Sequence, residues 1–269
     1  MLIQGISEAR TREELRDYIL THGCYSREEN MRIYEKWFVN APRYLFRAVD
    51  RKYGINEKIL CDVGCAYGMN LAFCAPGAYG IEVEEYEVRF ARSLGLTVYP
   101  RDVLNDDLSD LPMAEVVWCS AVLEHVDSPH VLLRKLYLLL EPEGLLAIYV
   151  PTIPLLPWLR HLPRLGRYFS GYAASDHINA FIPATLRFFC ERAGFKTVEI
   201  SPFYPGPLQF ASHVPMVSRL VDHCVYIGRK IEAWEYPEKA TRQVALNRTG
   251  FAFRGRMAAS GLLHVSRTG

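Results

Sequence analysis

From Lys58 onward the chain alternates between short apolar runs and segments with helical periodicity. The helical segments place apolar residues on one face, as the leucines that follow Ser128 and Pro129 do. The apolar runs predict strands at 59–63, 79–83, 97–99, 116–119, 145–150, 197–200 and 261–265. Strands that alternate with helices are typical of a parallel sheet with helices on both faces. We therefore expect an α/β fold with a doubly wound, mostly parallel sheet.

The part of the chain before this alternation is rich in helix formers. It predicts helices over 7–20 and 26–53, the second of them broken near Pro42. We therefore divide the chain into a helical N-terminal cap, 1–44, and an α/β domain, 45–269.

Two segments of the domain, 151–182 and 203–258, depart from the rhythm of strand and helix. The first threads four prolines through leucines, a tryptophan and arginines. A connection of this length crosses the C-terminal edge of the strands, where α/β proteins bind ligands. Structureless loops as long as this are uncommon without a role. We therefore predict that the two insertions form a lid over the substrate.

Composition and charge narrow the classes of function. The 269 residues carry 31 Lys and Arg against 30 Asp and Glu, and a net charge of +1 is not the basic excess of a general polyanion binder. The N-terminus lacks the apolar run of a signal peptide, and no run of about 18 apolar residues predicts a membrane span. The 7 cysteines include no C-x-x-C pair, which disfavours a zinc knuckle and is typical of buried, reduced thiols. We therefore expect a cytoplasmic protein.

The most informative stretch runs from Ile59 to Leu71 and reads ILCDVGCAYGMNL. It predicts a strand, a tight turn whose glycines let the backbone approach a ligand, and a helix whose N-terminus faces that ligand. Glu82 lies 18 residues after Gly64, at the end of the next predicted strand. An acid at that place can accept hydrogen bonds from two ribose hydroxyls. This order of elements predicts binding of a cofactor that contains adenosine.

Two details of the turn indicate which cofactor this is. A dinucleotide fingerprint requires glycines at 64, 66 and 69, whereas this chain has Gly64, Ala66 and Met69. Asp62 lies near the end of a buried strand, where an acid is costly unless it has a partner. A cationic ligand would provide that partner. S-adenosylmethionine carries a ribose, an ammonium and a sulfonium but no phosphate, so it suits these acids.

The same motifs resemble those of the class I (Rossmann-like) S-adenosylmethionine-dependent methyltransferases, in particular the small-molecule branch that includes quinone-biosynthesis enzymes. The run from Asp62 to Gly68 is similar to the family's D/E-x-G-x-G-x-G motif, with Ala66 at the middle glycine. Further motifs follow in the family's order: YGIE at 79–82, RDV at 101–103, EVVWCSAVLEHV at 115–126, LEPEGLL at 140–146, HINAF at 177–181 and LRFFCERAGF at 186–195. The resemblance extends from about 58 to 200.

This resemblance implies a seven-stranded sheet whose last strand is antiparallel. It implies S-adenosyl-L-methionine as the methyl donor and S-adenosyl-L-homocysteine as the product. The residues that it places at the cofactor are Asp62, Gly64, Cys65, Ala66, Tyr67, Gly68, Glu82, Asp102, Val103 and Cys119. Glu82 would hold the ribose, and Asp102 with Val103 would border the adenine. Tyr67 either covers the methionine portion of the cofactor or packs in the core.

Two histidines are candidate catalytic residues. His125 follows the fourth predicted strand, near the expected place of the methyl group, and His177 comes from the predicted lid. Either of them could contact the acceptor, or remove its proton if the acceptor must lose one. Ubiquinone-type enzymes resemble this segment, but they place two carboxylates and this histidine around a metal. Ala121 stands where one of those carboxylates would be, so we predict that the site uses no metal.

The methyl acceptor is constrained mainly by exclusion. Residues 119–122 read CSAV where methyltransferases of nucleobase amino groups carry D/N-P-P-Y/F, which disfavours DNA together with the low net charge. From Tyr226 onward the sequence has 8 Lys and Arg but only 3 Glu. This local excess of positive charge is most simply a solvent-exposed face, but it leaves open an RNA contact or an acidic acceptor. The leucines and prolines of 151–182 leave open a peripheral membrane contact with a lipid-like or quinone acceptor.

We expect methyl transfer from S-adenosylmethionine to an oxygen, nitrogen or carbon of a small molecule. The alternative from another class is a regulatory protein that binds S-adenosylmethionine and does not catalyse. Ala66 and Ala121, the two departures from the resembled motifs, allow this alternative. The sequence makes no prediction of the oligomeric state.

Overall fold

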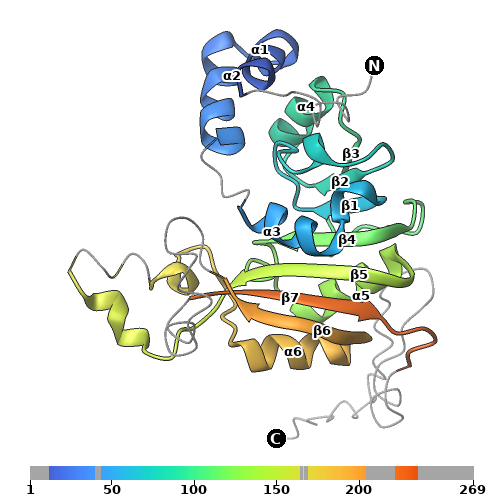
Figure 1. Cartoon of the computed structure of the whole chain (residues 1–269), viewed down its shortest axis with the longest axis vertical. Helices are drawn as coiled ribbons and strands as arrows, with labels where there is room; N and C mark the ends of the chain where they lie inside the picture. Colours follow the sequence, from blue (N-terminus) through green and yellow to red (C-terminus); the bar gives the residue numbers. More distant parts are fainter. Residues whose placement is uncertain (1–11, 40–43, 164–165, 167–168, 204–221, 236–269) are drawn as a thin grey trace, which may run out of the picture.

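The computed structural model describes residues 12–39, 44–163, 166, 169–203 and 222–235. Within them, a seven-stranded sheet has the order β3-β2-β1-β4-β5-β7-β6, and Figure 1 shows its strands stacked below the helices α1 and α2. The strands are β1 (Leu60–Val63), β2 (Tyr79–Glu82), β3 (Val98–Pro100), β4 (Ala114–Ser120), β5 (Leu140–Pro151), β6 (Phe195–Pro202) and β7 (His223–Lys230). The expected α/β, doubly wound fold is confirmed.

The strands β1 to β5 pair with one another in parallel, whereas β7 runs antiparallel to both of its neighbours, β5 and β6. The antiparallel last strand is therefore confirmed as well. Because parallel strands end at a common edge, the ends of β1, β2, β4 and β5 meet there. They bring Asp62, Glu82, Ser120 and Tyr149 to that edge.

Helices cover both faces of the sheet. The helices α3 (Tyr44–Tyr53) and α4 (Glu85–Ser93) pack on one face, and α5 (Pro129–Leu139) and α6 (Pro183–Arg192) pack on the other. Side chains alternate between the two faces along a strand. In β4, Val116 and Trp118 belong to the first apolar layer, whereas Val117 and Cys119 belong to the second.

The N-terminal part forms the helices α1 (Arg12–His22) and α2 (Arg27–Ile33) and a π-helical segment, η2 (Tyr34–Val39). Their buried Ile19 and Phe38 share an apolar cluster with Phe90 of α4, so the cap packs on the α/β core. The single helix expected over 26–53 is instead α2, η2 and α3 in succession. Its predicted break at Pro42 lies outside the described residues.

Two further predictions of elements need correction. No α-helix follows the glycine turn in the described residues, which form turns and one short 3-10 helix, η4 (Leu71–Phe73). Pro76 and Gly77 come only a few residues later. Because a proline disfavours helical backbone at the residue before it, there is little room for a helix between the turn and Pro76. The strand expected at 261–265 lies outside the described residues. The seventh strand is β7, inside the segment 203–258 that we interpreted as an insertion, so that interpretation is wrong for those eight residues.

The other predicted insertion, 151–182, leaves the sheet after β5 and carries two short 3-10 helices, η5 (Pro157–His161) and η7 (Gly171–Ala173). Figure 1 shows η5 projecting from the body of the molecule. Leu155 and Trp158 are exposed there. None of the helices in the described part of the chain is both long and apolar enough to cross a membrane. The role of this segment as a substrate lid remains a prediction.

Candidate functional site

A cavity of about 930 Å³ opens at the edge where the parallel strands end. Its walls come from the turn after β1, the end of β2, the loop after β3, the turn after β4 and the end of β5. Crevices at this edge are where α/β sheets bind ligands. Its volume is at the upper end of the range of about 300–1,000 Å³ that is usual for ligand pockets. The cavity is therefore the candidate site for a cofactor and a second, smaller molecule.

The glycine turn after β1 has three residues in the left-handed region: Gly64 (φ +70°), Ala66 (φ +47°) and Gly68 (φ +78°). The backbone N–H groups of Gly64 and Cys65 donate to the carbonyl of Ile81, which ties the turn to β2. A left-handed backbone costs a residue with a side chain about 1–2 kcal/mol. This explains why the family motif has glycine at the position of Ala66, and it shows that the turn keeps its shape with alanine there.

Replacing Ala66 with glycine is expected to raise the free energy of unfolding by up to about 1.6 kcal/mol. Relief of the left-handed strain gains about 1–2 kcal/mol, and the greater freedom of glycine in the unfolded chain removes about 0.4–1 kcal/mol. Chemical denaturation measures the change. The control is Ala48→Gly in helix α3, where the same substitution should cost about 1 kcal/mol. A loss of stability in Ala66→Gly would show that the strain is not relieved.

Glu82, at the end of β2, holds the turn through its carboxylate. One oxygen accepts the N–H of Ala66 (2.9 Å), and the other accepts those of Val83 (2.8 Å) and Glu84 (3.1 Å). The side chain is buried but lines the cavity. A carboxylate offers about four acceptor positions, so about one remains for a ligand hydroxyl beside the three backbone donors.

Asp62 is buried at the end of β1 and lines the same cavity. Within the protein it has a weak hydrogen bond from Asn70, whose Nδ2 lies 3.5 Å from Oδ2. Burial, together with the nearby Glu82, raises the pKa of Asp62 to about 8, even though Asn70 favours the ionised form. An incompletely partnered acid of this kind would be stabilised as an anion by a cationic ligand.

Acidic groups dominate the lining of the cavity. Its carboxylates are Asp62, Glu82, Glu84, Glu87, Asp102, Asp127 and Asp176. Among the described residues, Arg101 is the sole lysine or arginine that lines it. Burial and the neighbouring Glu82 and Glu84 raise the pKa of Glu87 to about 7. Such a cavity favours a cationic ligand and disfavours a pyrophosphate.

The loop after β3 contributes Asp102 and Val103, the pair expected at the adenine, and both line the cavity. The carboxylate of Asp102 accepts hydrogen bonds from Leu104 N (2.8 Å) and Asn105 Nδ2 (2.6 Å). Burial raises the pKa of Asp102, but these bonds outweigh that effect and hold its pKa below the ordinary value. Asp102 is therefore an ionised residue that shapes this loop.

Six of the ten residues predicted at the cofactor line the cavity, and four described ones do not: Cys65, Tyr67, Gly68 and Cys119. Tyr67 packs with its ring centroid 5.5 Å from those of both Trp37 and Phe90, in agreement with the second of its two predicted roles. Cys65 and Cys119 are buried in the apolar layers. Whether any of these residues contacts the cofactor remains a prediction.

The two candidate catalytic histidines, His125 and His177, lie together although they are 52 positions apart in the sequence. Their ring centroids are 4.8 Å apart. His125 lines the cavity, its Nδ1 lies 3.1 Å from the carbonyl of Asp176, and its Nε2 lies 3.9 Å from Oε1 of the buried Glu124. His177 does not line the cavity, and its Nδ1 is buried without a hydrogen-bond partner. Burial raises the pKa of Glu124 to about 7, against the opposing effect of His125.

Several lining residues were missed by the sequence analysis. Tyr149 lies near the end of β5, and Trp118 lies in β4 with its Nε1 buried and without a partner. The position of Tyr149 at a strand end could have revealed it. Trp37 of η2 and Phe203 after β6 carry no such signal, because only the packing of the N-terminal segment and of the antiparallel strands brings them to the cavity.

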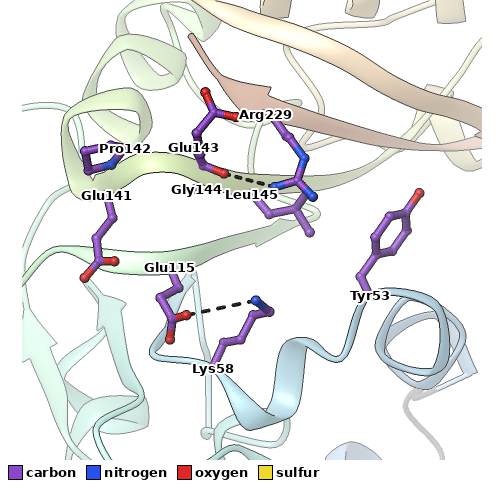
Figure 2. Close-up of a pocket in the computed structure, with 9 residues that line it drawn as sticks. All are labelled: Tyr53, Lys58, Glu115, Glu141, Pro142, Glu143, Gly144, Leu145 and Arg229. Carbon is purple, nitrogen blue, oxygen red and sulfur yellow. Dashed lines mark hydrogen bonds and ion pairs between the residues drawn. The ribbon is translucent and has the colours of Figure 1, made fainter. Parts of the chain in front are cut away.

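A second hollow, of about 140 Å³, lies at the opposite edge of the sheet, where β4 and β5 begin. Figure 2 shows that its two basic side chains are directed at partners within the protein: Lys58 pairs with Glu115 at 4.0 Å, and Arg229 donates to the carbonyl of Glu143 at 3.1 Å. The hollow is small and its cations are engaged, so we assign no ligand to it.

Comparisons with known proteins agree with this geometry. A sequence model described as a methyltransferase domain matches residues 34–200, which is more than half of the chain. No curated protein sequence matches the chain.

Solved structures show the same fold at low sequence identity. A SAM-dependent methyltransferase from Archaeoglobus fulgidus is 20% identical with a TM-score of 0.52, over 74% of this chain and 98% of that one. A SAM-dependent methyltransferase from Thermotoga maritima is 21% identical with a TM-score of 0.51, over 76% and 97%. A complex of the Trm112 methyltransferase activator with a methyltransferase from Haloferax volcanii gives 15% identity and a TM-score of 0.55, over 76% and 96%.

Proposed function

The chain belongs to the methyltransferase domain family, and from this premise we propose that its methyl acceptor is a small molecule with a hydroxyl or amino group. The protein is an S-adenosylmethionine-dependent methyltransferase. The observation that carries the proposal for the acceptor is the composition of the cavity beyond the glycine turn. There the aromatic side chains Trp118, Tyr149 and Phe203 share the lining with the polar His125.

The residues of the cavity suit this cofactor. Glu82 has about one acceptor position left for a ribose hydroxyl, and Asp62 offers a carboxylate to the ammonium group. When it is bound, S-adenosylmethionine supplies a methyl group on a sulfonium that departs as a neutral thioether. The acidic lining favours a positively charged ligand over the neutral one that remains after transfer. Release of the product is therefore assisted by the same carboxylates that favour the donor.

The residues around the acceptor act mainly by orientation. Methyl transfer is an in-line displacement, so alignment of the acceptor accounts for much of the acceleration. In our proposal the aromatic walls hold a flat or apolar acceptor. Because a carbonyl oxygen can only accept, Nδ1 of His125 is the protonated nitrogen in its bond to Asp176, and Nε2 carries the lone pair. Nε2 can then accept a proton from the acceptor when its hydroxyl or ammonium must lose one.

Turnover with a panel of small acceptors tests this proposal. Phenols, catechols and aromatic amines are incubated with S-adenosylmethionine, and formation of S-adenosylhomocysteine is measured. We expect turnover with members of the panel, and a loss of about 10²–10⁴ in kcat for His125→Ala without loss of affinity for S-adenosylhomocysteine. His22→Ala, on the exposed end of α1, is the matched control. Turnover restricted to RNA or to lipid vesicles would contradict the small-molecule proposal.

The affinity for S-adenosylmethionine is expected to rise with pH between about pH 6 and about pH 7.5. The pKa of Asp62 is about 8 without ligand, so most of these carboxyls carry a proton that a cationic ligand must displace. One displaced proton changes the affinity by at most about tenfold per pH unit. Calorimetry at several pH values measures the slope, and Asp62→Asn should reduce it to the part that comes from Glu87, whose pKa is raised to about 7 in the same cavity. An equal slope in wild type and variant would exclude Asp62 as its source.

Stability depends on the same group with the opposite sign. The folded pKa of Asp62, about 8, lies above its ordinary value. Between about pH 4 and about pH 8 the folded state therefore keeps a proton on Asp62 that the unfolded chain has already released. Asp62 therefore lowers the free energy of unfolding as the pH rises through that range. Asp62→Asn should flatten this part of the profile of stability against pH.

A further inference from the structure

We propose that Glu124, His125 and His177 bind a divalent transition-metal ion at the wall of the cavity. One possible ligand atom from each of the three residues lies within 4.8 Å of the others. Glu124 and His125 come from the turn after β4, and His177 comes from the segment between η7 and α6. Our sequence-based prediction of no metal depended on Ala121, and it considered no ligand from that distant segment.

The polar atoms of this cluster lack sufficient partners within the protein. Glu124 is 1% exposed, and its Oε2 has no hydrogen-bond partner. Nδ1 of His177 is likewise buried without a partner. Buried polar atoms are hydrogen-bonded in the large majority of cases, and a buried carboxylate is normally paired or coordinates a metal. A cation between these side chains would satisfy the oxygen and the nitrogen together.

The orientation of His125 also fits a ligand. Its Nδ1–H donates to the carbonyl of Asp176, which leaves the lone pair on Nε2, the nitrogen that lies 3.9 Å from Oε1 of Glu124. Metal-bound histidines commonly donate their other ring N–H to a backbone carbonyl or a carboxylate in this way. The contact therefore sets the tautomer that coordination requires.

Backbone contacts hold the distant segment against the turn. The carbonyl of Glu124 accepts the N–H groups of Ile178 and Asn179, both at 3.0 Å. Nδ2 of Asn179 donates to the carbonyl of Val126 at 2.6 Å. The ligand atoms of the three residues lie within 4.8 Å of one another, and those around a metal with bonds of about 2.1 Å lie about 3–4 Å apart. Metal binding would therefore draw these side chains closer together.

The donor set indicates the kind of metal. Two imidazoles and one carboxylate suit zinc, iron, cobalt or manganese better than magnesium or calcium, which prefer oxygen ligands alone. Three protein ligands leave a position open for water or substrate. Because His125 lines the cavity, a metal held there could lower the pKa of an acceptor hydroxyl. Nε2 of His125 would then bind the metal, and the metal would acidify the acceptor in place of a histidine base.

Metal binding is tested directly on the full chain after treatment with a chelator and dialysis. Calorimetric titrations with Zn²⁺, Co²⁺ and Mg²⁺ are compared, and the visible absorption of bound Co²⁺ reports its coordination. We expect one equivalent of Zn²⁺ or Co²⁺ in wild type, much weaker binding of Mg²⁺, and a loss of affinity of about 100-fold or more in Glu124→Gln and in His177→Ala. His22→Ala, which removes an exposed histidine of α1, should bind like wild type.

Binding of S-adenosylhomocysteine by each variant shows that it has folded. Wild type that binds no Zn²⁺ or Co²⁺, or folded variants that bind them like wild type, would overturn the proposal. No acceptor is present in these titrations, so their outcome is separate from that of the proposed function. If metal binding is confirmed, removal of the metal should lower turnover, and Zn²⁺ or Co²⁺ should restore it better than Mg²⁺.

Discussion

Replacing Glu82 with alanine is expected to weaken the binding of S-adenosylhomocysteine by about 10- to 150-fold. A hydrogen bond to a charged group contributes about 1.5–3 kcal/mol, and Glu82 is the carboxylate at the end of β2 proposed to receive a ribose hydroxyl. The substitution also frees three backbone donors, those of Ala66, Val83 and Glu84. The N–H of Ala66 belongs to the glycine turn, so part of the loss comes from a turn that is held less firmly.

Calorimetry with S-adenosylhomocysteine measures this effect, and Glu85→Ala is the matched control. Glu85 lies in the first turn of α4, is exposed, and carries the same charge without lining the cavity. Its removal should leave the affinity within about twofold of wild type, because exposed charges contribute little. Equal affinities of Glu82→Ala and wild type would show that the ribose is bound elsewhere.

Those parts of the fold that depend on local patterns were predictable from the sequence. The apolar run before Asp62 and the one before Glu82 became β1 and β2 within one residue at each end. The helix after Ser128 begins at Pro129 as expected, because proline suits the first helical position and Leu132 and Leu136 are both buried. In these segments local preference and burial in the core favour the same structure.

The elements that depend on tertiary contacts were not predictable in this way. β7 lies between β5 and β6, and its eight residues include the charged Arg229 and Lys230. What makes residues 223–230 a strand of the sheet is their pairing with both β5 and β6, which the local sequence does not report. The segment η2 has the composition of an α-helix, so its π-helical form could not be predicted from the sequence. Nor could the position of its Trp37 at the cavity.

In the candidate site, too, the residues that depend on local motifs were predictable and those that depend on tertiary contacts were not. Asp62, Gly64 and Glu82 stand at fixed places relative to strand ends, so the motif locates them at the cavity. Cys65 and Gly68 belong to the same motif but do not line the cavity. Cys65 is buried in the apolar core, and Gly68 packs closely against Leu96 and Ala91. The proximity of His177 to Glu124 is set by hydrogen bonds between segments that are distant in sequence, so no local pattern reports it.

Replacing Gly64 with alanine is expected to lower the free energy of unfolding by about 2–5 kcal/mol, and the two causes can be separated. A Cβ at this position would lie 2.5 Å from Cγ2 of Val122, a stiff side chain of the turn after β4. Overpacking of this kind costs about 1–3 kcal/mol. The φ of +70° adds about 1–2 kcal/mol for any side chain. A turn displaced by this contact would also lose affinity for S-adenosylhomocysteine.

The double variant Gly64→Ala with Val122→Ala separates overlap from strain, because it removes Cγ2 and keeps the left-handed backbone. We expect it to be less destabilised than the sum of the single variants by about 1–3 kcal/mol, a coupling that chemical denaturation can measure. Relative to Val122→Ala alone, the double variant should be less stable by about 1–2 kcal/mol, which is the left-handed strain that Ala66 already bears in the same turn. Additive effects of the two substitutions would show that Val122 does not limit this position. The close approach of β4 to the turn would then not explain the glycine.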